Sequence, residues 1–405
     1  MVYFDSPITV GKIHQIQNTF GGVVRDWNTK RADRYVVQLS RCNLSSSKLG
    51  EIWVQIAMIE NQKFNEEAKT MSRVLISTIC SLALMLGIST QANAGCGNIT
   101  IAEMNWASAE FMANVDKIIL EKGYGCKVEL VAGATMPTFT SMNEKGQPDI
   151  AAELWANAVA NPLKKAIAEG RLHSVNGGPI TGLGEGWWLP PHTVKKHPEL
   201  KTALDVLNNP QLFPHPEDPS KGAFVGCPAG WGCQLANNNL FRAFEMKKKG
   251  WILVDPGSAA GLDGSMAKAV ERGENWFGYY WSPTAMIGKY KMVKLDFGVP
   301  FAGSKNWDGC IVKPEQECAN PKPSAWTKSV VNTVVTDKFM KRSGAGAEFL
   351  KNRVYPGDIM NGMLVYMGDN QAGGKDAAVE FLKKHENVWT KWVPADVAAK
   401  VKADL

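Results

Sequence analysis

The chain has 405 residues, and its 45 Lys and Arg against 39 Asp and Glu give a net charge of +6. Residues 95–405 alone hold 35 Lys and Arg and 32 Asp and Glu, which leaves a net charge of only +3. That part of the chain is no polycation and has no basic cluster interleaved with aromatic residues. The composition therefore argues against nucleic acid as a partner.

Residues 71–94 have the pattern of a secretory signal peptide. Arg73 supplies a positive charge, 74–88 is an apolar core, and Ala92-Asn93-Ala94 is a small-residue cleavage site. The apolar core is too short for a stable membrane anchor. We therefore expect export to the periplasm and release as a soluble protein of 311 residues.

A signal peptide works at an N-terminus, yet seventy residues precede this one. We expect translation to start at Met71, so that residues 1–70 represent an extension from a misassigned upstream start. The alternative is a genuine N-terminal extension.

Beyond the cleavage site, apolar runs of strand length alternate with amphipathic stretches of helix length. We expect strands at residues 98–103, 127–132, 149–154, 223–226, 251–254, 276–280 and 292–297. We expect helices at residues 108–121, from 161 onward, at 265–272 and, as the last clear helix, at 376–385. Strands separated by helices indicate parallel α/β units. The polar, proline-rich stretch 193–221 is expected to be a surface excursion.

Residues 95–405 contain six cysteines, an even number that suggests disulfides in an exported protein. Proximity in sequence favours two pairs, and a third follows by elimination: Cys227–Cys233, Cys310–Cys318 and Cys96–Cys126. There is no CxxC pair and no ligand spacing among the six histidines, so neither a metal nor another cofactor is expected.

Cys96 could instead be a lipidated first residue. The preceding residues 93–95 lack the leucine expected three places upstream, and lipidation would leave Cys126 unpaired. We therefore favour the soluble form over the lipoprotein.

The segment CPAGWGC at 227–233 is the most informative stretch. Its cysteines can close a tight loop around Trp231, while Gly230 and Gly232 let the backbone turn and approach a ligand. An indole face attracts cations, and a concave run of amide N–H groups attracts anions. The loop therefore suits a small zwitterion. The alternative is a surface loop closed for stability, since so short a ring contributes about 2–3 kcal/mol.

Four tryptophans follow predicted strands: Trp106, Trp155, Trp231 and Trp281. In open α/β sheets ligands bind beyond the carboxyl ends of the strands, so we expect these side chains to contact a ligand. Each alone could be a packing residue, but aromatic walls are the recurrent solution for binding a methylated ammonium group. Five other tryptophans are expected to be packing residues: Trp251, Trp276, Trp326, Trp389 and Trp392.

The chain from residue 97 onward resembles the substrate-binding proteins of glycine betaine and related quaternary-amine ABC transporters. The resemblance is carried by CPAGWGC at 227–233, YYWSP at 279–283 and ELWAN at 153–157. It implies that Trp155, Trp231 and Trp281 wall a trimethylammonium group. It also implies that the amides of Gly232 and Cys233 hold the ligand carboxylate.

The resemblance further implies the family's fold and partners. The fold is a two-lobed, hinged α/β clamp of the type II periplasmic-binding-protein class, with the ligand between the lobes. One lobe would combine residues 97–183 with 297–405, and the other would comprise 184–296. The monomer would pass a small methylated amine to a membrane permease driven by an ATPase.

Two positions depart from the best-known glycine betaine pattern. That pattern has a histidine reaching the carboxylate, and the matching residue here is Val159. The four tryptophans together with Glu185 are similar to the trimethylamine N-oxide binders of the same superfamily. An anionic Glu185 would attract an ammonium group and repel a carboxylate, although it could also be a solvated or hinge glutamate. Choline or trimethylamine N-oxide is therefore the alternative ligand.

Two other functions compete with transport. An exported enzyme on the same fold would use Cys227 or Cys233 as its nucleophile, but the chain has no nucleophile elbow, phosphate loop or metal box. We therefore expect no catalysis. A sensor that binds the same amine and contacts a signalling protein stays open.

Overall fold

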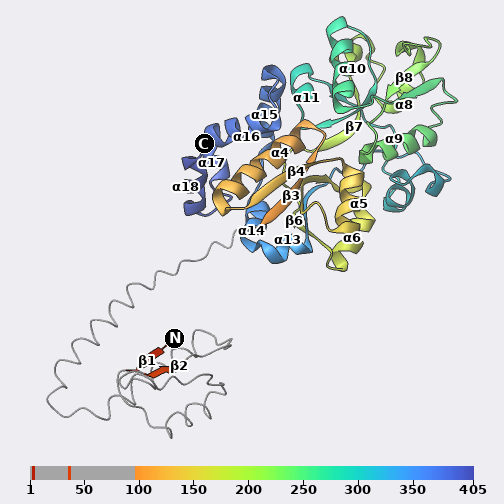
Figure 1. The fold of residues 1–405 in the computed structure, drawn as a ribbon. Helices are drawn as coiled ribbons and strands as arrows, with labels where there is room; N and C mark the ends of the chain where they lie inside the picture. The colour runs from red at the N-terminus through yellow and green to blue at the C-terminus, as the bar shows by residue number, and fades with distance from the viewer. Residues whose placement is uncertain (1, 5–34, 38–95) are drawn as a thin grey trace. The chain divides into compact units, whose positions relative to one another are not determined.

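The computed structural model describes residues 2–4, 35–37 and 96–405 (Figure 1). The chain divides into two units, one ending at Thr90 and the other beginning at Gln91. In the N-terminal unit, strands β1 (Val2–Phe4) and β2 (Tyr35–Val37) pair antiparallel. The signal peptide expected at 71–94 lies outside the described residues, as does nearly all of the stretch 1–70.

The first of two five-stranded sheets in residues 96–405 has the order β4-β3-β5-β12-β6. Its strands are β4 (Lys127–Gly133), β3 (Asn98–Met104), β5 (Ile150–Trp155), β12 (Val331–Thr336) and β6 (Leu172–Asn176). Strands β4, β3 and β5 are parallel, and β12 is antiparallel to β5 and to β6. Five of the six residues of the central strand β5 are buried, as expected where both faces of a sheet are covered.

We call this sheet and its helices the first lobe (Figure 1). The helices are α4 (Ala107–Ile118), α5 (Thr135–Lys145), α6 (Ala160–Ala168), α13 (Asp337–Arg342), α14 (Gly344–Asn352), α15 (Gly357–Asn370), α16 (Gly374–Lys384), α17 (Glu386–Trp389) and α18 (Ala395–Ala403). A single π-helical turn (Ile119–Gly123) extends α4, and a 3₁₀ turn (Ala156–Ala158) follows β5. The helix predicted at 108–121 is present and buries an apolar face, since Phe111, Val115 and Ile119 are fully buried.

The second sheet has the order β11-β7-β10-β8-β9 and forms, with its helices, the second lobe. Its strands are β11 (Val293–Lys294), β7 (Gly184–Leu189), β10 (Gly278–Ser282), β8 (Gly222–Val225) and β9 (Trp251–Val254). Its helices are α7 (Pro191–Lys196), α8 (Ala203–Leu207), α9 (Gly232–Ala243), α10 (Ala259–Arg272) and α11 (Ala285–Tyr290). The prediction of a two-lobed α/β fold is confirmed.

A third segment packs against α9. It contains α12 (Ser304–Asn306), a π turn (Trp307–Ile311) and a 3₁₀ turn (Glu315–Glu317). The Asn239 side-chain amide of α9 donates to the carbonyls of Ile311 and Lys313 at 3.0 and 2.8 Å. This segment therefore lies against the second lobe, although the next strand, β12, belongs to the first sheet.

Several predicted elements are wrong in type or position. Both sheets are mixed and not parallel, because β7, β11 and β12 run antiparallel to their neighbours. The strand expected at 276–280 begins two residues later. Only two residues of 292–297 form a strand, because the Gly298 N–H donates to Asp296 and closes a turn. The helix at 376–385 is not the last one, since α17 and α18 follow it.

The stretch 193–221 is not a surface excursion. It contains α8, whose start is fixed by a capping box in which Thr202 and Asp205 bond each other's backbone N–H. Leu200, Val206 and Phe213 are almost fully buried in the second lobe. The polar residues and prolines form turns between short buried segments. Because each buried segment is short, its apolar residues show no clear periodicity in the sequence.

The three disulfides of the described residues join the pairs named from the sequence, Cys96–Cys126, Cys227–Cys233 and Cys310–Cys318. The first joins the segment before β3 to the segment before β4, and the third closes a loop in the segment that packs on α9. Within the described residues, no helix combines the length and the apolar character needed to cross a membrane.

Candidate functional site

A cavity of about 30 Å³ lies between the two lobes. All seven residues that the sequence indicated as ligand contacts line it: Trp106, Trp155, Glu185, Trp231, Gly232, Cys233 and Trp281. They come from strands of both sheets, from the start of α4, from the loop before α9 and from the first turn of α9. We call the four tryptophans among them the tryptophan box.

The first lobe contributes Trp106 and Trp155. Trp106 lies between β3 and α4, and Trp155 is the last residue of β5. Because β3 and β5 are parallel neighbours, their carboxyl ends reach the same edge of the sheet. Both indole N–H groups donate to one oxygen of Glu153, at 2.9 and 2.8 Å.

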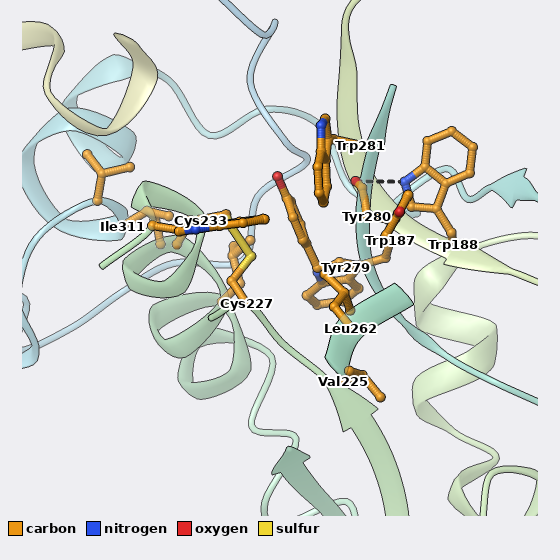
Figure 2. Close-up of a cluster of buried hydrophobic side chains, with 14 of the residues drawn as sticks. Trp187, Trp188, Val225, Cys227, Cys233, Leu262, Tyr279, Tyr280, Trp281 and Ile311 are labelled. Carbon is orange, nitrogen blue, oxygen red and sulfur yellow. Dashed lines mark hydrogen bonds between the residues drawn. A yellow bond between two sulfur atoms is a disulfide. The ribbon is translucent and has the colours of Figure 1, made fainter. Parts of the chain in front are cut away.

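The second lobe contributes Trp231 and Trp281. The two rings meet edge to face with centroids 5.1 Å apart, and Trp231 meets Trp106 in the same way at 5.4 Å. Trp281 lies within β10 and not beyond its end, because the strand ends at Ser282, two residues later than predicted. Figure 2 shows Tyr279 and Trp281 projecting from β10 near the Cys227–Cys233 disulfide.

The loop closed by Cys227 and Cys233 rests on the first lobe. Gly230 has a φ of +84°, which disfavours a side chain, and its carbonyl accepts from the Met136 N–H at 3.1 Å. A Cβ added at Gly232 would overlap the Cβ of Ala158, so only glycine fits there. The two glycines let the loop turn and approach closely, as the sequence indicated.

Trp231 also bridges the lobes, because its indole N–H donates to Asn105 Oδ1 at 2.8 Å. Helix α9 begins directly after it, with Gly232 and Cys233 as its first two residues. First-turn N–H groups of an α-helix have no acceptor within the helix and carry a partial positive charge. Two backbone donors are thus available beside the indole at the cavity wall.

Glu185 is buried in the cavity wall on β7, so it is not a solvated glutamate. Tyr279 Oη donates to one carboxyl oxygen at 2.9 Å, and Ser329 Oγ donates to the other at 3.0 Å. Burial raises the pKa of Glu185, while the two hydroxyl donors and the charge of Lys294 act in the opposite direction. The carboxyl is therefore a fixed polar group at one end of an aromatic cavity.

Several lining residues were not identified from the sequence: Thr135, Asn157, Ala158, Ala236, Tyr279, Trp307, Val312 and Trp326. Tyr279 could have been found, because it lies two residues before Trp281 and side chains two apart share one face of a strand. The interpretation of Trp326 as a packing residue is incomplete, since its ring also lines the cavity and stands 5.2 Å from the Tyr279 ring. Val159 is buried and is not among the lining residues.

Two observations bear on the alternatives of an exported enzyme and a metal site. Cys227 and Cys233 are joined in a disulfide, which removes the thiol nucleophile that an exported enzyme would have used. Among the described residues there is no group of three His, Cys, Asp or Glu side chains that could hold a metal ion. Aromatic faces, backbone amides and one buried carboxyl are suited to binding.

Two solved structures have the same fold. The choline-binding protein of an ABC transporter, in complex with choline, has a TM-score of 0.59 at 17% identity and covers 76% of this chain and 98% of its own. Lactococcal OpuAC, closed around glycine betaine, has a TM-score of 0.55 at 18% identity and covers 74% of this chain and all of its own. These likenesses confirm the two-lobed clamp.

Sequence comparison identifies the family. The glycine betaine/proline betaine-binding periplasmic protein of Escherichia coli (strain K12) is 23% identical over 232 residues, which are 55% of this chain and 67% of that protein. Residues 97–384 match the family described as the substrate-binding domain of the ABC-type glycine betaine transport system. That match spans well over half of the chain. The chain therefore belongs to this family of transporter substrate-binding domains.

Proposed function

We propose that the protein binds one small methylated amine in the cavity between its lobes, with the tryptophan box around the methyl groups. The observation that carries this proposal is the meeting of four indoles, two from each lobe, around one cavity. Each aromatic face contributes about 0.5–2 kcal/mol to binding a cation, and more when water is excluded. The tryptophan box can bind such a cation without forming an ion pair. Binding therefore stays reversible, and the ligand can be released.

The polar end of the ligand lies, in this proposal, at the start of α9. The amides of Gly232 and Cys233 are the donors for a carboxylate or another negatively polarised oxygen. Trp231 stands directly before them, so one short loop provides both a cation-binding face and anion-binding donors. Glycine betaine carries both groups and is the first candidate.

Choline or trimethylamine N-oxide is the second candidate, and the position of Glu185 favours it. One hydroxyl donor on each carboxyl oxygen is an arrangement typical of an ionised carboxylate. A carboxylate buried beside the ligand attracts an ammonium group and repels a second carboxylate. Val159 supplies no donor that would offset this repulsion for glycine betaine.

We infer a clamp mechanism from the enclosure of the site. Trp106, Trp231 and Trp281 are each about 95% buried, so a ligand reaches them only if the lobes separate. The proposed lobes comprise residues 97–183 with 297–405 and residues 184–296, with hinge motion at the crossovers. The segment at 304–317 is an exception within 297–405, because it packs on α9 and would move with the second lobe.

We propose a role that the family membership supports. The protein works in the periplasm as a monomer, carries out no turnover and delivers its ligand to a membrane permease driven by an ATPase. The periplasmic location of the Escherichia coli relative supports this assignment.

Calorimetric titration of residues 95–405 tests the proposal, with glycine betaine, choline, carnitine, proline betaine and trimethylamine N-oxide as ligands. We expect at least one to bind with a stoichiometry of one and a negative heat-capacity change, because apolar surface is buried. Absence of binding by all five would refute the proposal. The order of affinities separates the two candidates.

A further inference from the structure

Glu153 joins two walls of the tryptophan box through a single atom. Its Oε1 accepts from the indole N–H of Trp106 at 2.9 Å, from that of Trp155 at 2.8 Å and from Ser108 Oγ at 3.0 Å. Trp106 and Ser108 stand at the start of α4, whereas Glu153 and Trp155 belong to β5. One buried carboxyl oxygen therefore sets the positions of rings from two different elements.

Packing alone does not account for a glutamate at this position. The side chain is fully buried, and its second oxygen, Oε2, has no hydrogen-bond partner among the described residues. A buried carboxyl with an unpartnered oxygen lowers the stability of a fold. An apolar residue would fill the space without that penalty, but it would leave both indole N–H groups without an acceptor.

The charged groups around Glu153 are few. Arg353 acts on it from the segment after α14, but Asp116 of α4 faces the same guanidinium at 2.9 Å. Burial raises the pKa of the Tyr355 phenol, and the negative charge of Glu153 also helps to raise it. Glu185 lines the cavity in the wall of the second lobe. Burial is the largest influence and raises the pKa of Glu153 to about 7.

We propose that Glu153 is a positioning residue of the ligand site. Its Oε1 fixes the orientation of Trp106 and Trp155, and its negative charge behind the two rings strengthens their attraction for a methylated ammonium group. Hydrogen bonds to an anion polarise the donor groups, and the carboxylate also attracts the cation directly in a poorly solvated site. This inference rests on the proposed function of the box.

Ligand binding and the ionisation of Glu153 should be coupled. A bound cation stabilises the ionised form of Glu153, so binding and ionisation favour each other. The affinity for a ligand of fixed charge should therefore rise as the pH increases through about 7. A role limited to the packing of the fold would produce no such dependence.

The first test measures the Kd of choline, whose charge does not change between pH 5.5 and 8.5. We expect wild-type affinity to rise across this range. Glu153→Gln should lower affinity at pH 8.5 by about tenfold or more and flatten the pH profile, because the charge is lost. Glu185→Gln separates the contribution of the carboxyl that lines the cavity, and Glu144→Gln, on the exposed face of α5, is the matched control. Wild-type affinity and slope in Glu153→Gln would overturn the inference.

The second test needs neither a ligand nor a Glu153 variant. In the ligand-free protein, the indole N–H proton resonances of Trp106 and Trp155 should titrate together, because they share one acceptor. Trp106→Phe and Trp155→Phe assign the two resonances. Independent or absent titration would overturn the inference. Joint titration without binding of any methylated amine would refute the proposed function and, with it, the role of Glu153 toward a ligand.

Discussion

In the first lobe, Trp106 and Trp155 are tied by hydrogen bonds to one buried carboxyl, whereas in the second lobe Trp231 lies in a disulfide-closed loop and Trp281 in a strand. The first pair depends on an ionisable group, and the second pair depends on covalent and backbone structure. A change of pH should therefore act mainly on the first pair, and reduction of the disulfide mainly on the second. This difference allows the two halves of the site to be perturbed separately.

The largest expected effect concerns the first pair and the pH dependence of stability. The pKa of Glu153 is raised from 4.5 to about 7 in the fold, so its contribution to stability is fully present below pH 4.5 and is lost as the pH rises through 7. Glu153→Gln cannot ionise. Between pH 4.5 and 8, the wild type should lose up to about 3 kcal/mol of unfolding free energy that the variant keeps.

Denaturant titrations of both proteins across this range measure the difference. Asp116, whose pKa is also raised to about 7, is present in both proteins and largely cancels. A difference between the two curves that does not vary with pH would contradict the assignment of this titration to Glu153.

The next effect concerns ligand affinity at the second pair. Trp231→Ala or Trp281→Ala should each weaken binding by about 1–3 kcal/mol, because an aromatic face and its apolar contact are lost. The matched variants Trp231→Phe and Trp281→Phe retain a ring and should lose less. Calorimetric titration measures the affinities of both series. Wild-type affinity in all four variants would contradict the proposed tryptophan box.

The disulfide that closes the loop before α9 gives a smaller effect with a built-in control. Replacing Cys227 and Cys233 by Ser should lower the unfolding free energy by about 2 kcal/mol and also weaken ligand binding. Replacing Cys310 and Cys318 by Ser is the control, because it opens a ring of similar length. The sequence separation is 8 for Cys310–Cys318 and 6 for Cys227–Cys233. This control variant should lose a similar unfolding free energy but should retain a higher ligand affinity than the variant without the Cys227–Cys233 disulfide. Equal losses of affinity would contradict a specific role for the loop.

The smallest expected effect is a change in ligand preference. Glu185→Gln removes a charge that repels a ligand carboxylate, so the affinity ratio of glycine betaine to choline should rise about tenfold, or about 1.4 kcal/mol. Competition between the two ligands measures this ratio. An unchanged ratio would mean that Glu185 does not choose between them.

The strand-end tryptophans could be predicted because parallel strands bring their carboxyl ends to one edge, which needs only the order of elements in the chain. Trp281 was found even though its strand was placed two residues too early, since a short shift along β10 leaves it near the same edge. The loop at 227–233 was found because its cysteines and glycines are a local signal.

The contacts of Glu153 could not be predicted, because Trp106 lies 47 residues away and meets it only through the register of β3 and β5. Trp307 and Trp326 reach the cavity from a segment with little regular secondary structure, where their rings pack edge to face at 5.3 Å. No periodicity in the sequence indicates that arrangement. These parts of the site depend on packing between segments that are distant in the sequence, which local sequence patterns do not reveal.

A crystal structure of the protein saturated with the tightest-binding methylated amine tests the central claim most directly. The account predicts the methylated nitrogen within about 6 Å of the ring centroids of Trp106, Trp155, Trp231 and Trp281, with the polar oxygen toward the amides of Gly232 and Cys233. A ligand bound outside this cavity, or one with its methyl groups turned away from the four rings, would contradict it.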